Sequence, residues 1–455
     1  MNKSNSYLGT EPVGRLLLRL AIPSVVAQII NMLYNVVDRI YIGHIPDIGG
    51  LALTGIGVCA PILYLIPALA SLVSFGSSAR ASMSMGANDY PKAEKILGNT
   101  ATLLVLISII ETALTLIFAR PMLFSFGASS ETIDYAQSYI NIYIIGSIFV
   151  SLTLGLNTFI TAQGFAKVSM LTVTIGAVCN IILDPIFIYG FDMGVRGAAL
   201  ATVISQAISA AWVLRFLFGK KTVLRLRSIN FRPDMKLMLP CIALGLSPCI
   251  MQSTESILNI CFNSSLLKYG GDTAVGAMTI LSTIMQCTFL VLTGLTQGAQ
   301  PIISYNFGAK NARRVKDTFR LLFIVCVIFT ICIWALIMLF PGAIARLLTS
   351  NVELQEFAAW AMRIYCAGFI VFGIQVSCQQ TFIGIGNAKS SIFLAILRKL
   401  ILLIPLIYIL PNFLENKVFA VYLAEPVADV LAVATTATMF FMQFRKAMRK
   451  ISEQE

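Results

Sequence analysis

The sequence predicts an all-α polytopic membrane protein, with twelve transmembrane helices arranged in two six-helix lobes. Composition supports this prediction, since 57% of the 455 residues are hydrophobic and only 12% are charged. Soluble domains usually carry about twice that charged fraction. Apolar runs close to the ~20 residues that cross a bilayer recur along the whole chain. In addition, the two halves of the sequence repeat each other, which predicts two lobes related by a pseudo-two-fold axis along the membrane normal.

Twelve apolar segments lie between polar breaks, and each is a predicted span. They cover residues 16–42, 51–75, 94–119, 133–161, 168–190, 197–218, 237–267, 273–300, 318–340, 354–383, 389–411 and 418–444. Several exceed the length needed to cross, so we expect tilted or extended helices. Prolines inside the segments, such as Pro23 and Pro185, predict kinks.

Basic residues indicate the direction in which the chain crosses. Most of the 33 Lys and Arg residues fall in loops on one side of the twelve segments, including a run of five in residues 220–232. Because cytoplasmic loops of membrane proteins are enriched in Lys and Arg, this side is predicted to be cytoplasmic. Both termini are then cytoplasmic, which requires an even number of crossings. The net charge of +12 is assigned to these loops, and no nucleic-acid partner is predicted.

The two halves align at one gapless offset of 222 residues over much of their length. The aligned identities include Gly76 with Gly298, Gly86-Ala87 with Gly308-Ala309, Tyr143 with Tyr365, and Lys167 with Lys389. Near the start of each half the offset is 217, which pairs Asp38 with Glu255. The predicted organisation is an N-terminal lobe of residues 1–218, a basic cytoplasmic linker of residues 219–235, and a C-terminal lobe of residues 236–455. Parallel repeats of this kind place a transport path at the repeat interface.

Cysteine and histidine usage argues against metal and enzyme chemistry. All ten cysteines lie in apolar segments without zinc or redox spacing, and His44 is the one histidine. Intramembrane enzymes need His/Glu metal motifs, paired aspartates or Ser-Lys dyads. We therefore expect no enzyme, no cofactor and no resident metal.

Several short motifs resemble the multidrug and toxic compound extrusion (MATE) family. They are Met85-Gly86-Ala87 and its repeat Phe307-Gly308-Ala309, Gln163-Gly164, the stretch from Asn180 to Pro185, and Gly197-Ala-Ala. Their order and duplication are similar to the MepA-like branch of bacterial multidrug exporters. The resemblance implies a V-shaped, two-lobed bundle in the bacterial cell membrane that exports amphipathic cations in exchange for H⁺ or Na⁺.

Acidic residues inside the spans are candidate sites, since a carboxylate at bilayer depth costs at least ~2–3 kcal/mol. Asp38, Asp184 and Thr202 lie about five to seven residues from the outer ends of spans 1, 5 and 6, which is ~7–11 Å below the surface at ~1.5 Å per residue. Asn180 lies one turn before Asp184 on the same face. The resemblance assigns Asp38, Asn180, Asp184 and Thr202 to the family's coupling-ion pocket, where Asp38 and Asp184 suit H⁺ or Na⁺. A neutral, hydrogen-bonded polar knot is the alternative.

The second half carries a different set of charged residues. Glu255 occupies the repeat position of Asp38 and is predicted either to attract cationic substrate or to be a second protonation site. In spans 11 and 12, Arg398, Lys399, Glu425 and Asp429 lie at overlapping depths. We expect these four residues to form a structural ion-pair cluster.

Polar residues on the spans predicted to border the cleft are candidate substrate contacts: Gln28, Asn31, Asn35, Gln252, Asn259, Gln286 and Gln379. The predicted function is a monomeric secondary active exporter of amphipathic organic cations, driven by H⁺ or Na⁺ and working by alternating access. A lipid-linked oligosaccharide flippase of the same superfamily is the alternative, and it requires basic residues in the cavity.

Overall fold

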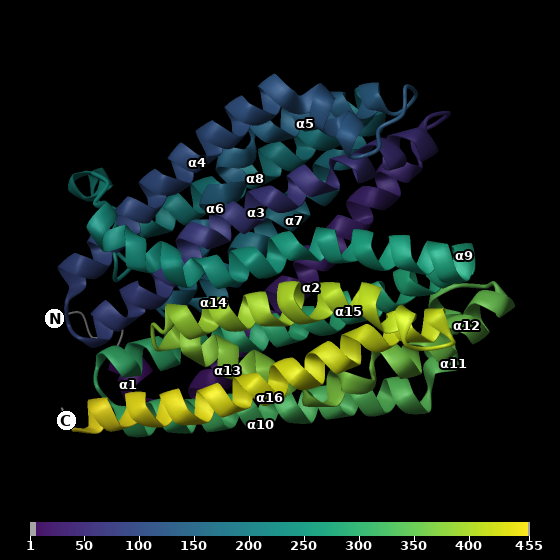
Figure 1. Cartoon of the computed structure of the whole chain (residues 1–455). Helices are drawn as coiled ribbons and strands as arrows, with labels where there is room; N and C mark the ends of the chain where they lie inside the picture. Colours follow the sequence, from purple (N-terminus) through teal and green to yellow (C-terminus); the bar gives the residue numbers. More distant parts are fainter. Residues whose placement is uncertain (1–5, 454–455) are drawn as a thin grey trace.

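The structure is a computed structural model that describes residues 6–453, so the first five and last two residues of the predicted lobes lie outside the described residues. It is nearly all helical and consists of two bundles (Figure 1). After the short helix α1 (Ser6–Thr10), the first bundle contains α2 (Val13–Gly43), α3 (Gly49–Gly86), α4 (Tyr90–Ser125), α5 (Ile133–Ile145), α6 (Ser147–Ala162), α7 (Ala166–Pro185) and α8 (Val195–Phe218). The second contains α9 (Met235–Gly308), α10 (Ala312–Leu339), α11 (Pro341–Leu348), α12 (Val352–Tyr365), α13 (Phe372–Gly384), α14 (Ala388–Ile396), α15 (Ile404–Ile409) and α16 (Lys417–Ser452).

Membrane-crossing helices account for most of the chain. Among the described residues, nine helices are long and apolar enough to span a bilayer, and two bent pairs raise that number to eleven. The 74-residue helix α9 has a non-helical residue, Gly271 (φ 64°, ψ −162°), between the predicted spans 7 and 8. A division of α9 at Gly271 is consistent with twelve crossings.

Two predicted spans are broken rather than continuous. Helices α5 and α6, which replace the span predicted over residues 133–161, meet at an angle of 52°. Their counterparts in the second half, α12 and α13, meet at 41° after a 3₁₀ segment, Ala367–Val371. Each break contains a glycine of the internal repeat, Gly146 or Gly368. At Gly146 an added Cβ would lie 2.4 Å from a methyl carbon of Val203, so the bend allows α8 to approach closely.

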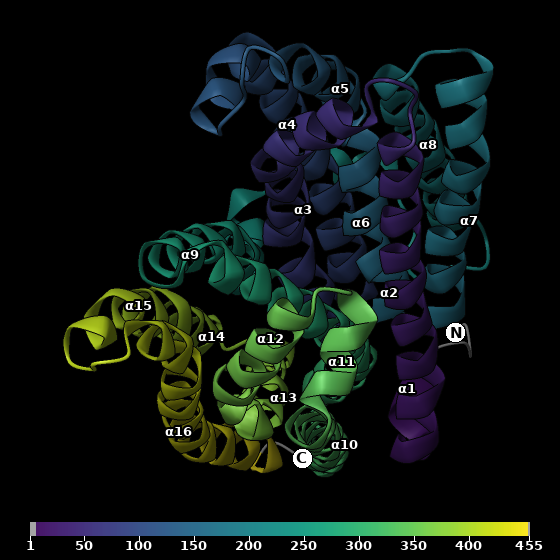
Figure 2. The ribbon, with the colours of Figure 1, turned by 90° about the vertical axis from the view of Figure 1, so that its right-hand side faces the viewer.

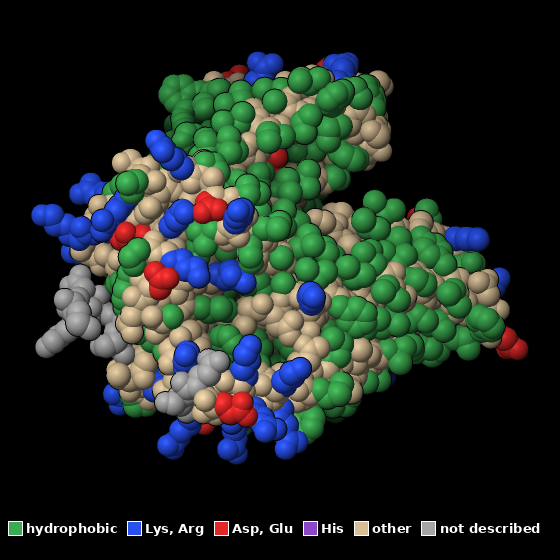
Figure 3. Space-filling model, turned by 60° about the vertical axis from the view of Figure 1, so that its left-hand side comes forward, with side chains coloured by type: hydrophobic (Ala, Val, Ile, Leu, Met, Phe, Trp, Pro, Cys, Tyr) green, Lys and Arg blue, Asp and Glu red, His purple; other side chains and the backbone are tan. Residues whose placement is uncertain are grey.

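The two bundles separate at one end and meet at the other, where both termini lie (Figures 1 and 2). The space-filling view shows the hollow between them, opposite the terminal end (Figure 3). At the joined end, α3 packs on the start of α9, where a Cβ on Gly76 would lie 2.0 Å from the Cys241 carbonyl oxygen. The repeat partner Gly298 packs in the same way on α2 at Ala21. These paired contacts have the pseudo-two-fold relation that the repeat predicts.

The start of the chain packs against the second bundle. Leu8 of α1 and Leu16 and Leu20 of α2 are fully buried in the same hydrophobic core as residues of α9 and α10. Asn306 Nδ2 donates to the Leu8 carbonyl (3.0 Å), and Arg314 Nη2 donates to the same oxygen (3.1 Å). Helix α2 therefore links the two bundles at the joined end, and its remaining half leads into the first bundle.

The predicted linker is held against the end of the first bundle. The buried Gln163 Oε1 accepts hydrogen bonds from the backbone N–H groups of Val223 and Leu224, each at 2.8 Å. Lys95 of α4 forms an ion pair with Asp234 (2.6 Å), whose side chain also caps the first turn of α9. This hydrogen bond from Lys95 holds the pKa of the half-buried Asp234 carboxyl below its ordinary value. The Gln163-Gly164 motif thus has a structural explanation in linker docking.

The surface matches a bilayer environment. Large apolar side chains such as Ile117 (69% exposed) and Phe441 (68% exposed) face outward from the helices. Figure 3 shows broad hydrophobic areas over both bundles, whereas Lys and Arg side chains gather at the joined end. A soluble protein would bury such surface, but lipid solvates it at no cost.

Candidate functional site

A polar pocket in the first bundle is built by three helices. Helix α2 supplies Asp38, α7 supplies Asn180 and Asp184, and α8 supplies Thr202. Pro185 follows Asp184 directly and lacks the N–H that would bond to the Ile181 carbonyl, so α7 ends there and continues as a π-helical turn, Ile186–Gly190. The helix therefore changes geometry at the acidic residue.

The side chains of this pocket contact one another as the sequence predicts for a common depth. Asn180 Nδ2 donates to Asp184 Oδ1 (3.1 Å) and to Thr202 Oγ1 (3.3 Å). Thr202 Oγ1 donates in turn to the Ala198 carbonyl (3.0 Å). The carboxyl groups of Asp38 and Asp184 lie within hydrogen-bonding reach of each other.

Three acceptor oxygens of the pocket are buried without a hydrogen-bond donor: Asp38 Oδ1, Asn180 Oδ1 and Asp184 Oδ2. Asp184 itself is fully buried and Asn180 is 1% exposed. Two carboxylates cannot both stay ionised at this separation inside the membrane without a cation between them. The arrangement is therefore suited to bind either a shared proton or a small hard cation such as Na⁺ through oxygen ligands. The described residues contain no group of three or more His, Cys, Asp or Glu that would form a conventional metal site.

Tyrosines surround the two acids, although no sequence pattern predicts them as site residues. Tyr34 of α2 lies near Asp38 and Asp184, and Tyr139 and Tyr143 of α5 lie near Asp38. The rings of Tyr139 and Tyr143 stack with centroids 5.7 Å apart. Tyr143 was visible only as a repeat identity with Tyr365, which lies close to Glu425 and Glu255 in the second bundle. That shared identity was the one signal available in the sequence.

The second bundle has an ionic cluster at the related position. Arg398 Nε donates to Asp429 Oδ1 (2.7 Å), and Arg398 Nη2 donates to Glu425 Oε1 (2.9 Å). Lys399 Nζ donates to Glu255 Oε1. The four predicted cluster residues thus come together, and Glu255 joins them through Lys399. The Arg398 guanidinium also lies 4.7 Å above the ring of Phe372.

The predicted cleft residues divide into two groups. Gln28 and Gln252 contact residues of the other bundle, since Gln28 Nε2 donates to Gln297 Oε1 (3.2 Å) and Gln252 Nε2 donates to Ser71 Oγ (3.1 Å). Among the described residues, the other five make no such hydrogen bond between the bundles. Asn35, Asn259 and Gln286 are exposed, and Asn31 is half-buried. Gln379 is buried and donates to Ser247 Oγ within the second bundle.

The sequence matches a known protein family in both halves. The MatE family model matches residues 23–186 and 248–409, which correspond to the two repeats. The chain belongs to the MATE family. It is 24% identical over 430 residues to the multidrug export protein MepA of Staphylococcus haemolyticus (strain JCSC1435), and 25% identical to MepA of Staphylococcus aureus (strain NCTC 8325 / PS 47). Each alignment covers 94% of both chains.

Solved MATE structures have the same fold. A crystal structure of MATE in the bent conformation superposes with a TM-score of 0.92 at 22% identity and covers 99% of this chain and 100% of that one. An outward-facing multidrug resistance MATE family transporter of the MOP superfamily superposes with a TM-score of 0.90 at 23% identity, with coverage of 98% and 99%. The V-shaped, two-lobed architecture implied by the MATE resemblance is confirmed.

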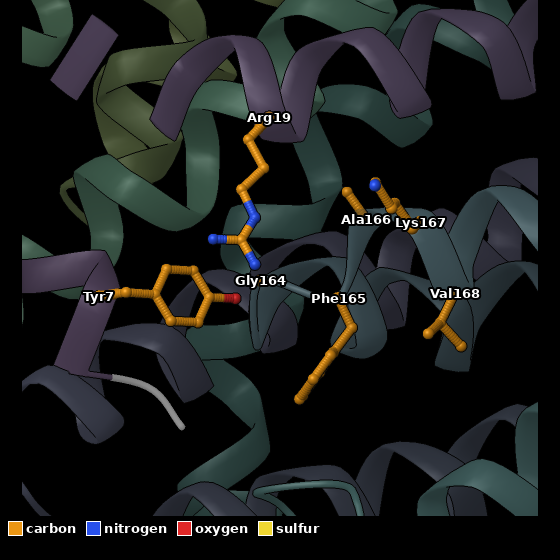
Figure 4. A pocket seen from close by; sticks show the side chains of 7 residues that line it. All are labelled: Tyr7, Arg19, Gly164, Phe165, Ala166, Lys167 and Val168. Atoms are coloured by element: carbon orange, nitrogen blue, oxygen red, sulfur yellow. The ribbon is translucent and has the colours of Figure 1, made fainter. Parts of the chain in front are cut away.

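A separate pocket of about 390 Å³ lies at the joined end of this MATE family member (Figure 4). Figure 4 shows Arg19 extending toward Tyr7, with its guanidinium 4.8 Å from the ring centroid. Arg19 also pairs with Glu11 (3.2 Å). Because Arg19 and Asp38 are 19 residues apart on α2, this pocket lies roughly 28 Å along the helix from the acidic site. None of the predicted site residues lines it.

Proposed function

We propose that this chain is a secondary active multidrug exporter that exchanges H⁺ or Na⁺ for amphipathic organic cations by alternating access. The observation that carries the proposal is the pair Asp38 and Asp184, two carboxyl groups in reach of each other with unpartnered oxygens inside the first bundle. The MepA proteins to which the chain is similar are multidrug exporters. Two neighbouring acids that can share a proton or hold Na⁺ suit the coupling site of such a protein.

The proposed transport cycle uses the two ends of the V differently. With the basic, joined end in the cytoplasm, the hollow opens to the outside, and the pocket loads H⁺ or Na⁺ from the outer medium. Neutralising Asp38 and Asp184 removes their mutual repulsion and allows α2, α7 and α8 to repack. The lobes then open toward the cytoplasm, where the ion leaves and a cationic substrate enters. Substrate and coupling ion thus bind in alternate states.

The charge distribution favours an exporter of cations over a lipid-linked oligosaccharide flippase. A flippase would need free basic side chains in the cavity to hold a pyrophosphate group. Arg398 and Lys399 are 5% and 3% exposed, and both are paired with acidic residues of neighbouring helices. Asp38 and Asp184 have no basic partner within hydrogen-bonding distance among the described residues.

Transport in proteoliposomes tests the proposal directly. Vesicles that contain the purified protein and ethidium are given an H⁺ gradient alone, an Na⁺ gradient alone, or neither, and ethidium movement is followed by fluorescence. We expect movement against the ethidium gradient with one of the two ions and none without a gradient. Ethidium movement that is the same in all three conditions, or absent in all, would contradict ion-coupled export.

A further inference from the structure

Lys399, a buried residue of the second bundle, forms an ion pair with the exposed Glu255. The Lys399 side chain is 3% exposed and that of Glu255 is 58% exposed, although the two side chains are hydrogen-bonded. One turn earlier on α9, Gln252 contacts Ser71 of α3, so Glu255 lies next to the junction between the bundles. Because a carboxylate exposed to lipid is costly, the open side of Glu255 faces the hollow between the bundles. Lys399 and the hollow are therefore on opposite sides of the Glu255 carboxylate.

Backbone geometry directs two neighbouring basic residues to two different helices. Arg398 and Lys399 lie in a π-helical segment, Leu397–Leu403, which widens the helix between α14 and α15. From this segment Arg398 reaches Glu425 and Asp429 of α16, whereas Lys399 reaches Glu255 of α9. The segment therefore forms ion pairs with acidic residues of two different helices.

With all five groups ionised, the cluster has one negative charge more than its bases neutralise. Glu255, Glu425 and Asp429 supply three carboxylates, and Arg398 and Lys399 supply two cations. In addition, Glu425 Oε2 is buried and has no hydrogen-bond partner. Lys399 lies close enough to Glu425 to interact electrostatically with it. Glu425 is thus a second carboxylate that attracts the Lys399 ammonium.

We propose that Lys399 is an internal counter-cation of Glu255, which a cationic substrate displaces so that Lys399 pairs with Glu425 Oε2 instead. This inference rests on the proposed function as an exporter of organic cations. One substrate charge at Glu255 balances the cluster, with three cations against three carboxylates. A substrate with two charges leaves one positive charge unpaired in a site of low dielectric, which is unfavourable. Lys399 therefore selects for singly charged substrates.

Equilibrium binding to the purified protein in detergent tests this role without any gradient. The probes are tetraphenylphosphonium, which carries one permanent charge, and decamethonium, which carries two, and isothermal titration calorimetry measures both affinities. We expect Lys399→Met to shift the ratio of the two affinities toward decamethonium by about tenfold, since an unpaired charge is removed. The control Lys417→Met removes the same charge from an exposed position and should leave the ratio unchanged.

Further variants separate displacement from a merely structural ion pair. Lys399→Met should fold, since the Glu255 it leaves is exposed to solvent. Glu425→Gln, which removes the second carboxylate but keeps the Lys399–Glu255 pair, should weaken tetraphenylphosphonium binding about tenfold. The double variant Lys399→Met/Glu425→Gln keeps the net charge of the native cluster and should bind tetraphenylphosphonium more tightly than the native protein. The double variant Lys399→Met/Glu255→Gln should lose the shift toward decamethonium that Lys399→Met alone produces.

The outcomes distinguish this inference from the proposed function. If the native protein exports ethidium but Lys399→Met leaves both affinities and their ratio unchanged, or weakens both equally, the counter-cation role is wrong and the exporter proposal stands. The role is equally wrong if an export-active protein binds neither probe. A native protein that neither binds the probes nor exports ethidium refutes both the proposed function and the inference.

Discussion

Gly86 and Gly308 occupy reciprocal positions where the two bundles meet. A Cβ on Gly86 would lie 1.9 Å from the Tyr305 carbonyl oxygen, and a Cβ on Gly308 would lie 1.9 Å from the Met83 carbonyl oxygen. Gly86 and Gly308 are repeat partners, and so are Met83 and Tyr305. Each half of the chain thus makes the same contact with the other, as expected for residues beside the pseudo-two-fold axis. The joined end is closed by backbone contact, which leaves no room for a side chain.

Replacement of either glycine should open the joined end. We expect Gly86→Ala to push the ends of α3 and α9 apart, because an overpacked contact of this kind costs about 1–3 kcal/mol. The distance between spin labels on the exposed positions Ala87 and Ala309 should increase and broaden, measured by double electron–electron resonance in detergent.

Gly57→Ala is the matched control for this experiment. Gly57 lies on the same helix, and a Cβ there would meet nothing within 4 Å. The control should leave the Ala87–Ala309 distance unchanged. Identical distances in the native protein and in Gly86→Ala would show that the glycine contact does not hold the joined end closed.

Asp184→Asn should stop gradient-driven ethidium export, by at least about 100-fold, while the folded protein remains in the membrane. Asparagine keeps the volume and the hydrogen bond with Asn180, but it neither carries a proton nor offers charge to Na⁺. Stability should hold or rise, because a buried acid is removed. Asp38→Asn should act similarly, and the double variant should be little worse than either single one.

Asp192→Asn provides the control for Asp184→Asn, with the same chemical change at an exposed residue just beyond the π-helical turn. Proteoliposome efflux and thermal unfolding of all variants are measured side by side. Export by Asp184→Asn at the native rate would place the coupling site elsewhere, with Glu255, Glu425 and Asp429 as the next candidates.

Labelling of single cysteines should establish the orientation of the chain. In a background without the native cysteines, we expect cysteines at Asp47, Asp192 and Asp272 to react with an impermeant thiol reagent outside intact cells. Cysteines at Lys221 and Arg313 should react only after permeabilisation. All five positions are exposed, so burial does not limit the reaction. Labelling of position 221 from outside would overturn the predicted topology.

The ion pair between Lys95 and Asp234 should stabilise the linker in a pH-dependent way. The pKa of Asp234 is lowered in the folded protein, so the pair contributes stability above the unfolded pKa of about 3.9 and loses it as the pH falls through the folded pKa. Asp234→Asn keeps a residue suited to cap α9 but removes the charge. The melting temperature should therefore be lower in Asp234→Asn than in the native protein from pH 5 to 8. This difference should shrink as the pH falls below about 4 and through the folded pKa, and a difference that stays constant as the pH is lowered below about 4 would contradict the assignment.

The sequence alone determined the architecture and predicted which side chains form the candidate site. Long apolar segments admit only membrane helices, because backbone groups in lipid must be satisfied within the segment. The constant repeat offset predicted two equivalent lobes, and helical spacing predicted that Asn180 and Asp184 share a face. Asp38 and Thr202 were grouped with them from depth, since equal distance from the membrane surface brings residues of adjacent spans to one level.

Only the tertiary structure decided which residues at the same membrane depth contact one another. Spacing along a helix says nothing about how the helix is rotated toward its neighbours, so Tyr34, Tyr139 and Tyr143 could not be placed beside Asp38 from the sequence. The bends between α5 and α6 and between α12 and α13 were missed for a related reason, since glycine permits a break without requiring one.

Lys399 shows the same limit in the second bundle. Its pairing with Glu255, 144 residues away, depends on a π-helical segment that the apolar sequence around it does not signal. Hydrophobic patterning determines which segments enter the membrane, whereas the direction of each polar side chain inside it depends on packing between helices.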